Sequence, residues 1–218
     1  MLAAEMIGPG GSVVAVDRNR DVLAIARERA RAADYDNIKF LEGSAEALKT
    51  GDRFDFAIGR YVLVHQPDPA VLIRAVATHV RPGGVVAFHE VGLHDNRNLT
   101  VPPIPLWSKT YDWIMTAFQS VMLHPDAGAR MVEHFHRAGL KRTPTLFCET
   151  PTGGGLESPL YGWAVHTLRN LIPQLEKIGV VTSGEIDIDT LEDRLRRSVV
   201  DSHGQLMSFT QFCGWARL

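Results

Sequence analysis

The chain has 218 residues, 45% of them hydrophobic, and a formal net charge of -2. That length supports one substantial core, and the near-neutral charge argues against a nucleic-acid-binding surface. No apolar run approaches the ~20 residues of a membrane span, and no secretory signal is visible. The two cysteines have neither metal nor disulfide spacing, so we expect a protein of the reducing cytoplasm.

The first part of the chain alternates between helix and strand patterns. Residues 1–7 read as the last turns of a helix that Gly8 ends, and residues 13–16 are a short, continuously apolar strand that leads to Asp17. Further on, the pattern predicts helices at 21–33 and 69–80, strands at 37–41, 54–59 and 85–91, and turns at 46–48 and 81–84. Strands that alternate with helices of ~12 residues predict an α/β fold with a doubly wound, mostly parallel sheet.

The pattern changes between residues 92 and 125. Three prolines are followed by an aromatic-rich helix at 106–123, which we expect to be a helical insertion that lies over the site as a lid. Downstream, the pattern predicts helices at 126–138, 160–176 and 190–201, strands at 143–149 and 207–215, and a flexible glycine loop at 153–155.

Asp17 stands where a nucleotide ligand could be bound. In doubly wound sheets, ligands lie across the carboxyl ends of the strands, and a carboxylate there can accept the hydroxyl hydrogens of a ribose. A glycine-rich turn after the preceding strand is its usual companion, but residues 8–11 follow a helix and precede a strand. Those glycines are better explained as a helix C-cap, and Asp17 itself could be a helix N-cap or a turn residue.

Four segments, in order and at family-like spacing, resemble the class I S-adenosylmethionine-dependent methyltransferases of the UbiE-like, small-molecule type. They are residues 10–17, 40–46, 54–65 and 81–87. The resemblance implies a single Rossmann-like domain over residues 1–218, with S-adenosylmethionine as cofactor and methyl transfer to a small, apolar or aromatic acceptor. The family's first strand and glycine-rich loop have no counterpart, so we expect this first strand to be missing and its two neighbours to have unpaired edges.

The resemblance also implies a set of cofactor-binding residues. They are Asp17, Arg18, Ser44, Ala45, Glu46, Arg60 and Tyr61. Asp17 would bind the ribose, with Arg18 flanking the adenosine. Ser44, where many relatives have aspartate, begins the loop that would flank the adenine, although this loop also fits a helix N-cap. Arg60 and Tyr61 follow the fourth strand, where the family presents backbone carbonyls to the ammonium group of the cofactor.

Acceptor-binding candidates lie near the mouth of the same site. His65 could orient the acceptor or take its proton, although a polar residue beside a helix is the plainer interpretation. His89 lies with Glu90 and His94 where the fifth strand ends, and these residues could line the acceptor pocket. Trp107 and Tyr111 could form an apolar wall there, unless they only pack the insertion onto the sheet.

Two alternatives remain open from the sequence alone. A Rossmann-type NAD-dependent oxidoreductase also has an acid after its second strand, and a non-catalytic, truncated remnant would lack the glycine loop. His89, Glu90 and His94 do not have the spacing of a zinc motif, so we expect no metal site. The expected partner is a small molecule, without nucleic acid or membrane, and a homodimer is compatible with the sequence.

Overall fold

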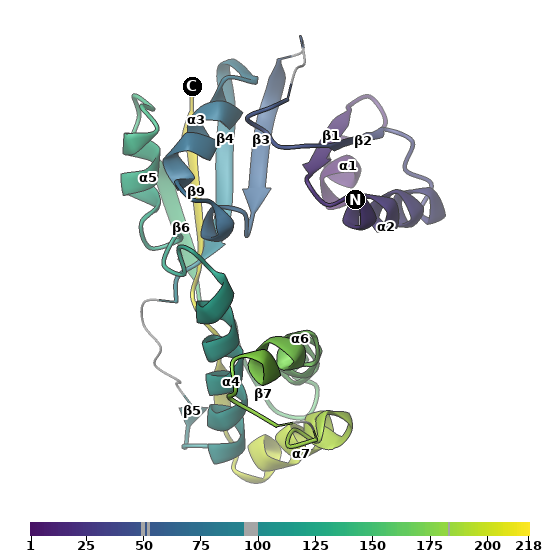
Figure 1. The fold of residues 1–218 in the computed structure, drawn as a ribbon, viewed down its shortest axis with the longest axis vertical. Coiled ribbons are helices and arrows are strands. Elements are labelled where there is room, and N and C mark those ends of the chain that lie inside the picture. Colours follow the sequence, from purple (N-terminus) through teal and green to yellow (C-terminus); the bar gives the residue numbers. More distant parts are fainter. Residues whose placement is uncertain (49–50, 52, 94–99, 183) are drawn as a thin grey trace. The chain divides into compact units, whose positions relative to one another are not determined.

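A computed structural model describes residues 1–48, 51, 53–93, 100–182 and 184–218. The chain divides into two compact units, Met1–Phe54 and Asp55–Leu218, and each is described by itself (Figure 1). The single domain over residues 1–218 stays a prediction. Within the described ranges, none of the helices combines the length and apolar character needed to cross a membrane.

The first unit is a small parallel α/β element. It contains α1 (Leu2–Ile7), β1 (Val13–Asp17), α2 (Arg20–Ala32) and β2 (Ile38–Glu42). β1 and β2 pair in parallel, and the register ends with Asp17 opposite Glu42. Gly8 ends α1 with a φ of 70°, which confirms the predicted cap. Asn19 caps α2, because its side chain accepts hydrogen bonds from the N–H groups of Asp21 and Val22.

The second unit is built on a four-stranded sheet. Its order is β3 (Phe54–Arg60), β4 (Val80–Val91), β9 (Gln211–Arg217) and β6 (Thr145–Glu149). β9 is antiparallel to both β4 and β6, so those two strands run in the same direction. A Cβ added to Gly84 would lie 2.7 Å from the Asp55 carbonyl oxygen, and one added to Gly59 would lie 2.6 Å from the Phe88 ring. Residue numbers therefore rise together along β3 and β4, as in a parallel pair.

These pairings confirm the expected Rossmann-like α/β fold with a mostly parallel sheet. β9 is the reversed strand of the four. Within the described residues, β1 has only β2 beside it and β3 has only β4, so each has one edge without a neighbouring strand.

Two helices and a short 3-10 helix cover part of this sheet. They are α3 (Pro69–Ala77), α5 (Met131–Arg137) and η1 (Leu63–His65). α3 packs on β4 and α5, and α5 packs on β9. Phe88 and Phe135 meet edge to face with ring centroids 6.1 Å apart. The buried side chains of this core include Leu63, Val64, Ile73, Val86, Phe88, Met131 and Phe135. Tight apolar packing thus fixes the strand β4, which carries His89 and Glu90.

Three longer helices make a second cluster with its own small sheet. α4 (Pro105–Val121), α6 (Pro159–Lys177) and α7 (Ile188–Asp201) contact one another, and β5 (Thr100–Val101), β8 (Gln205–Met207) and β7 (Thr152–Gly154) form an antiparallel sheet. The buried side chains here include Trp107, Tyr111, Ile114, Tyr161, Leu168, Leu191, Leu195 and Val199. The insertion predicted at 92–125 corresponds to β5 and α4, with residues 94–99 outside the described part, and its role as a lid stays a prediction.

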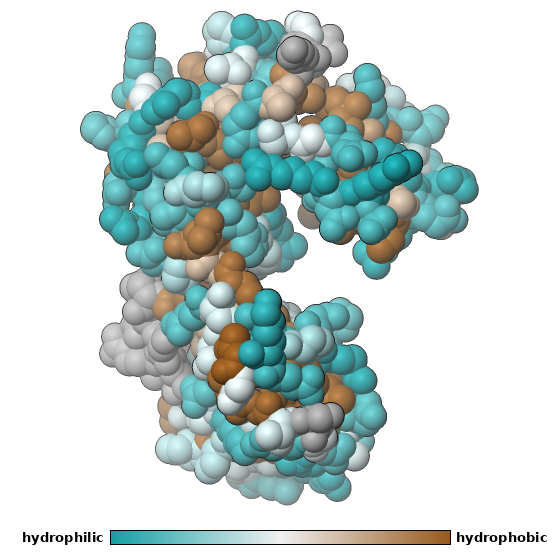
Figure 2. Space-filling view, in the orientation of Figure 1, coloured by the Kyte–Doolittle hydropathy of each residue, from teal (hydrophilic) through white to brown (hydrophobic). Residues whose placement is uncertain are grey.

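Apolar side chains also reach the surface of the chain. Figure 2 shows apolar atoms interspersed with hydrophilic ones on the visible face. Two neighbouring outward positions of β3, Phe56 and Ile58, are 62% and 70% exposed, and Phe147 of the edge strand β6 is 56% exposed. The helices α3 and α5 therefore do not cover these side chains.

Five predicted boundaries were wrong. The helix predicted at 69–80 ends at Ala77, and Val80 already belongs to β4. Residues 81–84 belong to β4 rather than to a separate turn, although Gly83 has a φ of 80°. The helix predicted at 126–138 begins only at Met131, because the N–H of Gly128 donates to the Val91 carbonyl instead of to a helical partner. The strand predicted at 207–215 is two strands, β8 and β9. The glycine loop at 153–155 lies partly in β7, which pairs with β8. Long-range pairing explains each difference.

Candidate functional site

Asp17 ends β1 and forms a tight local turn. Its Oδ1 accepts a hydrogen bond of 2.7 Å from the N–H of Asn19, and its carbonyl accepts one of 2.9 Å from the N–H of Gly43. Within the described residues, Oδ2 accepts no hydrogen bond. The turn function considered from the sequence is therefore present, and it leaves one carboxylate oxygen at the strand end for a ligand hydroxyl.

The loop after β2 meets the loop after β1. The Ser44 hydroxyl accepts a hydrogen bond of 3.3 Å from the N–H of Ala47, and Arg18 Nη2 lies 3.6 Å from Glu46 Oε2. Burial alone would raise the pKa of Glu46. Hydrogen bonds from its own N–H and from Ser44, with the charge of Arg18, outweigh burial and lower the pKa. The structure thus brings the predicted residues 17–18 and 44–46 together at the carboxyl ends of β1 and β2.

The bend after β3 has an unusual backbone conformation. Tyr61 has a φ of 52°, which is uncommon for a residue other than glycine. Its N–H donates to the His89 carbonyl at 2.9 Å, and its hydroxyl donates to Gln211 Oε1 at 2.6 Å. The Arg60 guanidinium lies over the Tyr61 ring, 4.8 Å from the centroid. Since the Tyr61 side chain is occupied in holding this bend, the backbone is the part best placed to serve a ligand.

Glu90 holds the bend after β3, a role that sequence reasoning did not give it. It is fully buried, and its Oε1 accepts hydrogen bonds of 2.9 Å from the N–H groups of both Val62 and Leu63. Burial raises the pKa of Glu90 to about 7, although the nearby backbone N–H groups of Leu63, Val62 and Val64 act to lower it. An acidic residue inside the apolar strand 85–91 was a signal for it, because a buried carboxyl group needs partners.

The two histidine candidates have different surroundings. His89 lies beside Tyr61, with ring centroids 5.6 Å apart. Burial foremost and the charge of Arg60 lower the pKa of His89, although Glu149 acts to raise it, so a neutral imidazole is favoured. His65 lies in η1, and its side chain is exposed. His94, considered with His89 for a zinc motif, lies outside the described residues.

Trp107 and Tyr111 are almost completely buried in α4. They are 1% and 2% exposed, and α4 packs against α6. The indole N–H of Trp107 has no hydrogen-bond acceptor among the described residues. Packing accounts for their burial, and contact with an acceptor stays a prediction.

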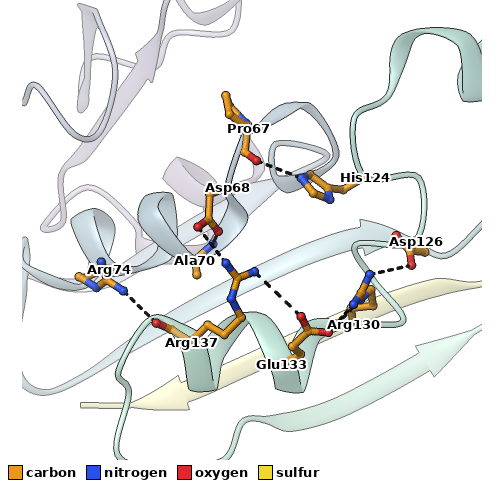
Figure 3. Close-up of polar contacts among 9 residues, drawn as sticks. All are labelled: Pro67, Asp68, Ala70, Arg74, His124, Asp126, Arg130, Glu133 and Arg137. Atoms are coloured by element: carbon orange, nitrogen blue, oxygen red, sulfur yellow. Dashed lines mark hydrogen bonds and ion pairs between the residues drawn. The ribbon is translucent and has the colours of Figure 1, made fainter.

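The chain after the bend is held from its other side as well. The Val64 carbonyl accepts a hydrogen bond of 3.0 Å from the N–H of His124, and the His124 ring lies 3.3 Å from the Pro67 carbonyl oxygen. Arg137 of α5 reaches Asp68 at 3.0 Å and joins it to the charged side chains of α5 (Figure 3). The segment from Tyr61 to Asp68 is therefore fixed by residues distant in sequence.

Parallel strands with acidic and polar residues at their carboxyl ends, beside one reversed strand, define the class I methyltransferase type of Rossmann-like fold. Residues 1–129 match the protein family described as a methyltransferase domain, and the chain belongs to this family. The matched region contains Asp17, the Ser44–Glu46 loop, the bend at Tyr61 and Glu90.

Curated relatives support the same family. The chain is 28% identical over 113 residues to the demethylmenaquinone methyltransferase of Listeria monocytogenes, which covers 51% of this chain and 44% of that protein. It is 38% identical over 90 residues to the ubiquinone biosynthesis O-methyltransferase of Albidiferax ferrireducens, covering 40% and 36% of the two chains. The chain spans less than half the length of these relatives in the matched regions.

Solved structures support the fold alone. A protein of Bacillus halodurans C-125 assigned as a methyltransferase has a TM-score of 0.57 at 16% identity, over 94% of this chain and 82% of that chain. The YcgJ protein of Bacillus subtilis has a TM-score of 0.54 at 14% identity, over 95% and 83%. At these identities, the likeness extends to the arrangement of helices and strands.

Proposed function

We propose that this chain binds S-adenosylmethionine and transfers its methyl group to a small, apolar or aromatic acceptor. The observation that carries the proposal is the family match over residues 1–129, which contains both sets of cofactor-binding candidates. The sulfonium of the cofactor already activates the methyl group. The protein must therefore chiefly hold the two reactants in line and exclude water.

Each unit, taken by itself, contains candidates for cofactor binding. In the first unit, the free Oδ2 of Asp17 would accept ribose hydroxyls, and the loop at residues 44–46 would flank the adenine. In the second unit, the backbone of Arg60 and Tyr61 would accept from the ammonium group. A neutral His89 beside this bend would be able to accept a proton from a hydroxyl-bearing acceptor. His65 remains a second candidate for that role.

The relatives and the aromatic helix support the proposed acceptor class. Two relatives are named for demethylmenaquinone and for ubiquinone biosynthesis. Trp107 and Tyr111 would form the apolar wall for such a ring, as predicted from the sequence. The proposal includes a small-molecule acceptor as partner, without nucleic acid or membrane, a homodimer as the assembly, and the cytoplasm as the compartment.

Calorimetric titration of the chain with S-adenosylmethionine and, separately, with NAD tests this proposal. We expect heat of binding with the first ligand and none with the second. Transfer of a labelled methyl group from the cofactor to demethylmenaquinone would then test the acceptor class. Binding of NAD alone would favour an oxidoreductase, and binding of neither ligand would favour a non-catalytic chain.

A further inference from the structure

Three consecutive backbone N–H groups of the bend after β3 are bound by the end of β4. Tyr61 donates to the His89 carbonyl, and Val62 and Leu63 both donate to Glu90 Oε1. All three hydrogen bonds are 2.9 Å long. A single side chain thus holds two of these three groups, at a bend whose first residue has a φ of 52°.

The 3-10 helix after the bend needs an acceptor from another part of the chain. η1 begins after Val62, whose side chain makes no capping hydrogen bond. The first N–H groups of a helix have no partner within it, and leaving them unpaired and buried is costly. Glu90 supplies the missing acceptor, 28 residues along the chain from Val62.

The surroundings of Glu90 keep water away from this contact. A Cβ added to Gly128 would lie 2.7 Å from the Val91 carbonyl oxygen and 2.9 Å from the Glu90 carbonyl oxygen. Glycine at 128 thus allows the segment before α5 to lie directly against the strand end. The second carboxyl oxygen of Glu90 has no partner among the described residues. A fully buried carboxyl group with one oxygen unpartnered lowers the stability of the fold. A residue with this cost is therefore a candidate for a purpose beyond packing.

We infer that Glu90 is a positioning residue, whose carboxyl group fixes the backbone of Tyr61, Val62 and Leu63 to receive the methionine part of the cofactor. This inference rests on the proposed function, since it assigns a purpose to the bend within that site. Glu90 acts through the backbone that it holds. Removal of its acceptor oxygen should loosen the bend and weaken cofactor binding. An uncharged acceptor in the same place should keep the bend ordered and preserve the affinity for the cofactor.

Amide hydrogen exchange of the full chain tests the contact without any ligand. Glu90→Gln keeps an acceptor oxygen, and Glu90→Leu removes it at similar volume. We expect exchange at Val62 and Leu63 to accelerate about tenfold or more in Glu90→Leu and to stay within about threefold of the unsubstituted chain in Glu90→Gln. Glu90→Asp, one methylene shorter, should lie between these values and replaces Glu90→Leu if that variant does not fold. The inference would be overturned if Val62 and Leu63 exchanged in Glu90→Leu, or in Glu90→Asp, at the same rate as in the unsubstituted chain.

Titration of the same variants with S-adenosylmethionine tests the purpose of the contact. We expect an affinity loss of about tenfold in Glu90→Leu or Glu90→Asp and little change in Glu90→Gln. Val86→Ala is the matched control, because Val86 is a fully buried residue of the same strand and has no bond to the bend. It should lower the melting temperature and leave affinity unchanged. A loosened bend with unchanged affinity would overturn only the inference. Absence of binding by the unsubstituted chain would instead overturn the proposed function and the assigned purpose together.

Discussion

The candidate binding residues of the first unit and those of the second unit are held by different kinds of contact. In the first unit, Asp17 binds the N–H of Asn19 and Ser44 binds that of Ala47, two and three residues away in sequence. In the second unit, Glu90 reaches Val62 across 28 residues, and Tyr61 reaches Gln211 across 150. Local contacts can be recognised in a sequence, whereas long-range ones depend on how the chain folds.

The hydrogen bonds of the two units also differ in how strongly their loss should affect stability. The hydrogen bonds of Asp17 and Ser44 are exposed to solvent, so water competes for each of them. The bond from Leu63 to Glu90 is buried, and a group left unpaired there would lose its solvation entirely. We therefore expect substitutions in the second unit to affect stability strongly, and substitutions in the first unit to affect mainly ligand binding.

Trp107→Ala should have the largest effect on stability. Trp107 is 1% exposed, and its removal would leave a cavity in the packing of α4, so we expect a loss of about 3–5 kcal/mol in the free energy of unfolding. Urea denaturation would measure this loss. Trp113→Ala, on the same helix but only half-buried, is the control and should cost less. An increase in the acceptor KM with an unchanged melting temperature would instead assign Trp107 to the acceptor pocket.

Glu90→Gln should change the pH dependence of stability. Burial raises the pKa of Glu90 from its ordinary 4.5 to about 7, without a contribution from a neighbouring charge. The folded chain therefore retains a proton that the unfolded chain has lost, and stability falls as the pH rises from about 4.5 through 7. At pH 8.5 the cost of the ionised group approaches 3 kcal/mol, at about 1.4 kcal/mol for each pKa unit.

Glutamine lacks this ionisation. Between pH 5 and pH 8.5, Glu90→Gln should therefore gain up to about 3 kcal/mol of stability relative to the unsubstituted chain. Denaturation at the two pH values measures this difference. A difference that stays constant with pH would show that ionisation of Glu90 does not destabilise the folded chain. The contrast between the two units would then weaken.

Sequence patterns predicted much of the fold and the local turns of the first unit. The apolar run before Asp17 and the cap at Gly8 use rules that act within a few residues, and both appear as expected. The pattern predicts a single strand at 207–215, because nothing local marks its division. That division depends on pairing with β7 and β4.

The role of Glu90 was missed for a comparable reason. Periodicity places Glu90 at a strand end, but it cannot show that the bend at Tyr61 brings two N–H groups to its carboxyl oxygen. The start of α5 was likewise misplaced, because the contact of Gly128 with Val91 is visible only in the folded chain. The roles of side chains that act through long-range backbone contacts are therefore the hardest to predict from the sequence.

Asp17→Ala should weaken cofactor binding with a smaller effect on stability. We expect a loss of about 1.5–3 kcal/mol in binding free energy, the scale of a hydrogen bond to a charged group. Asp17→Asn is the matched variant, since its side-chain oxygen can still accept from Asn19 and preserve the turn. Calorimetry with S-adenosylmethionine would measure both. Unchanged affinity in Asp17→Ala would remove this residue from the site.

Arg18→Ala should have the smallest effect, and it probes the local character of the first unit. The Arg18 side chain is 65% exposed and lies 3.6 Å from Glu46, so water screens the pair. We expect a stability loss below about 1 kcal/mol that diminishes further as salt is added. Because the pKa of Glu46 is lowered in the folded chain, its contribution is present above pH 4.5 and declines as the pH falls below that value.

The stability loss of Arg18→Ala should therefore be larger at pH 7 than at pH 3.5. Thermal unfolding at low and high salt, at both pH values, measures the difference. A loss well above 1 kcal/mol that salt does not reduce would mean that Arg18 and Glu46 form a desolvated pair. In that case the first unit would also rely on burial, and local contacts would not be what distinguishes the two units.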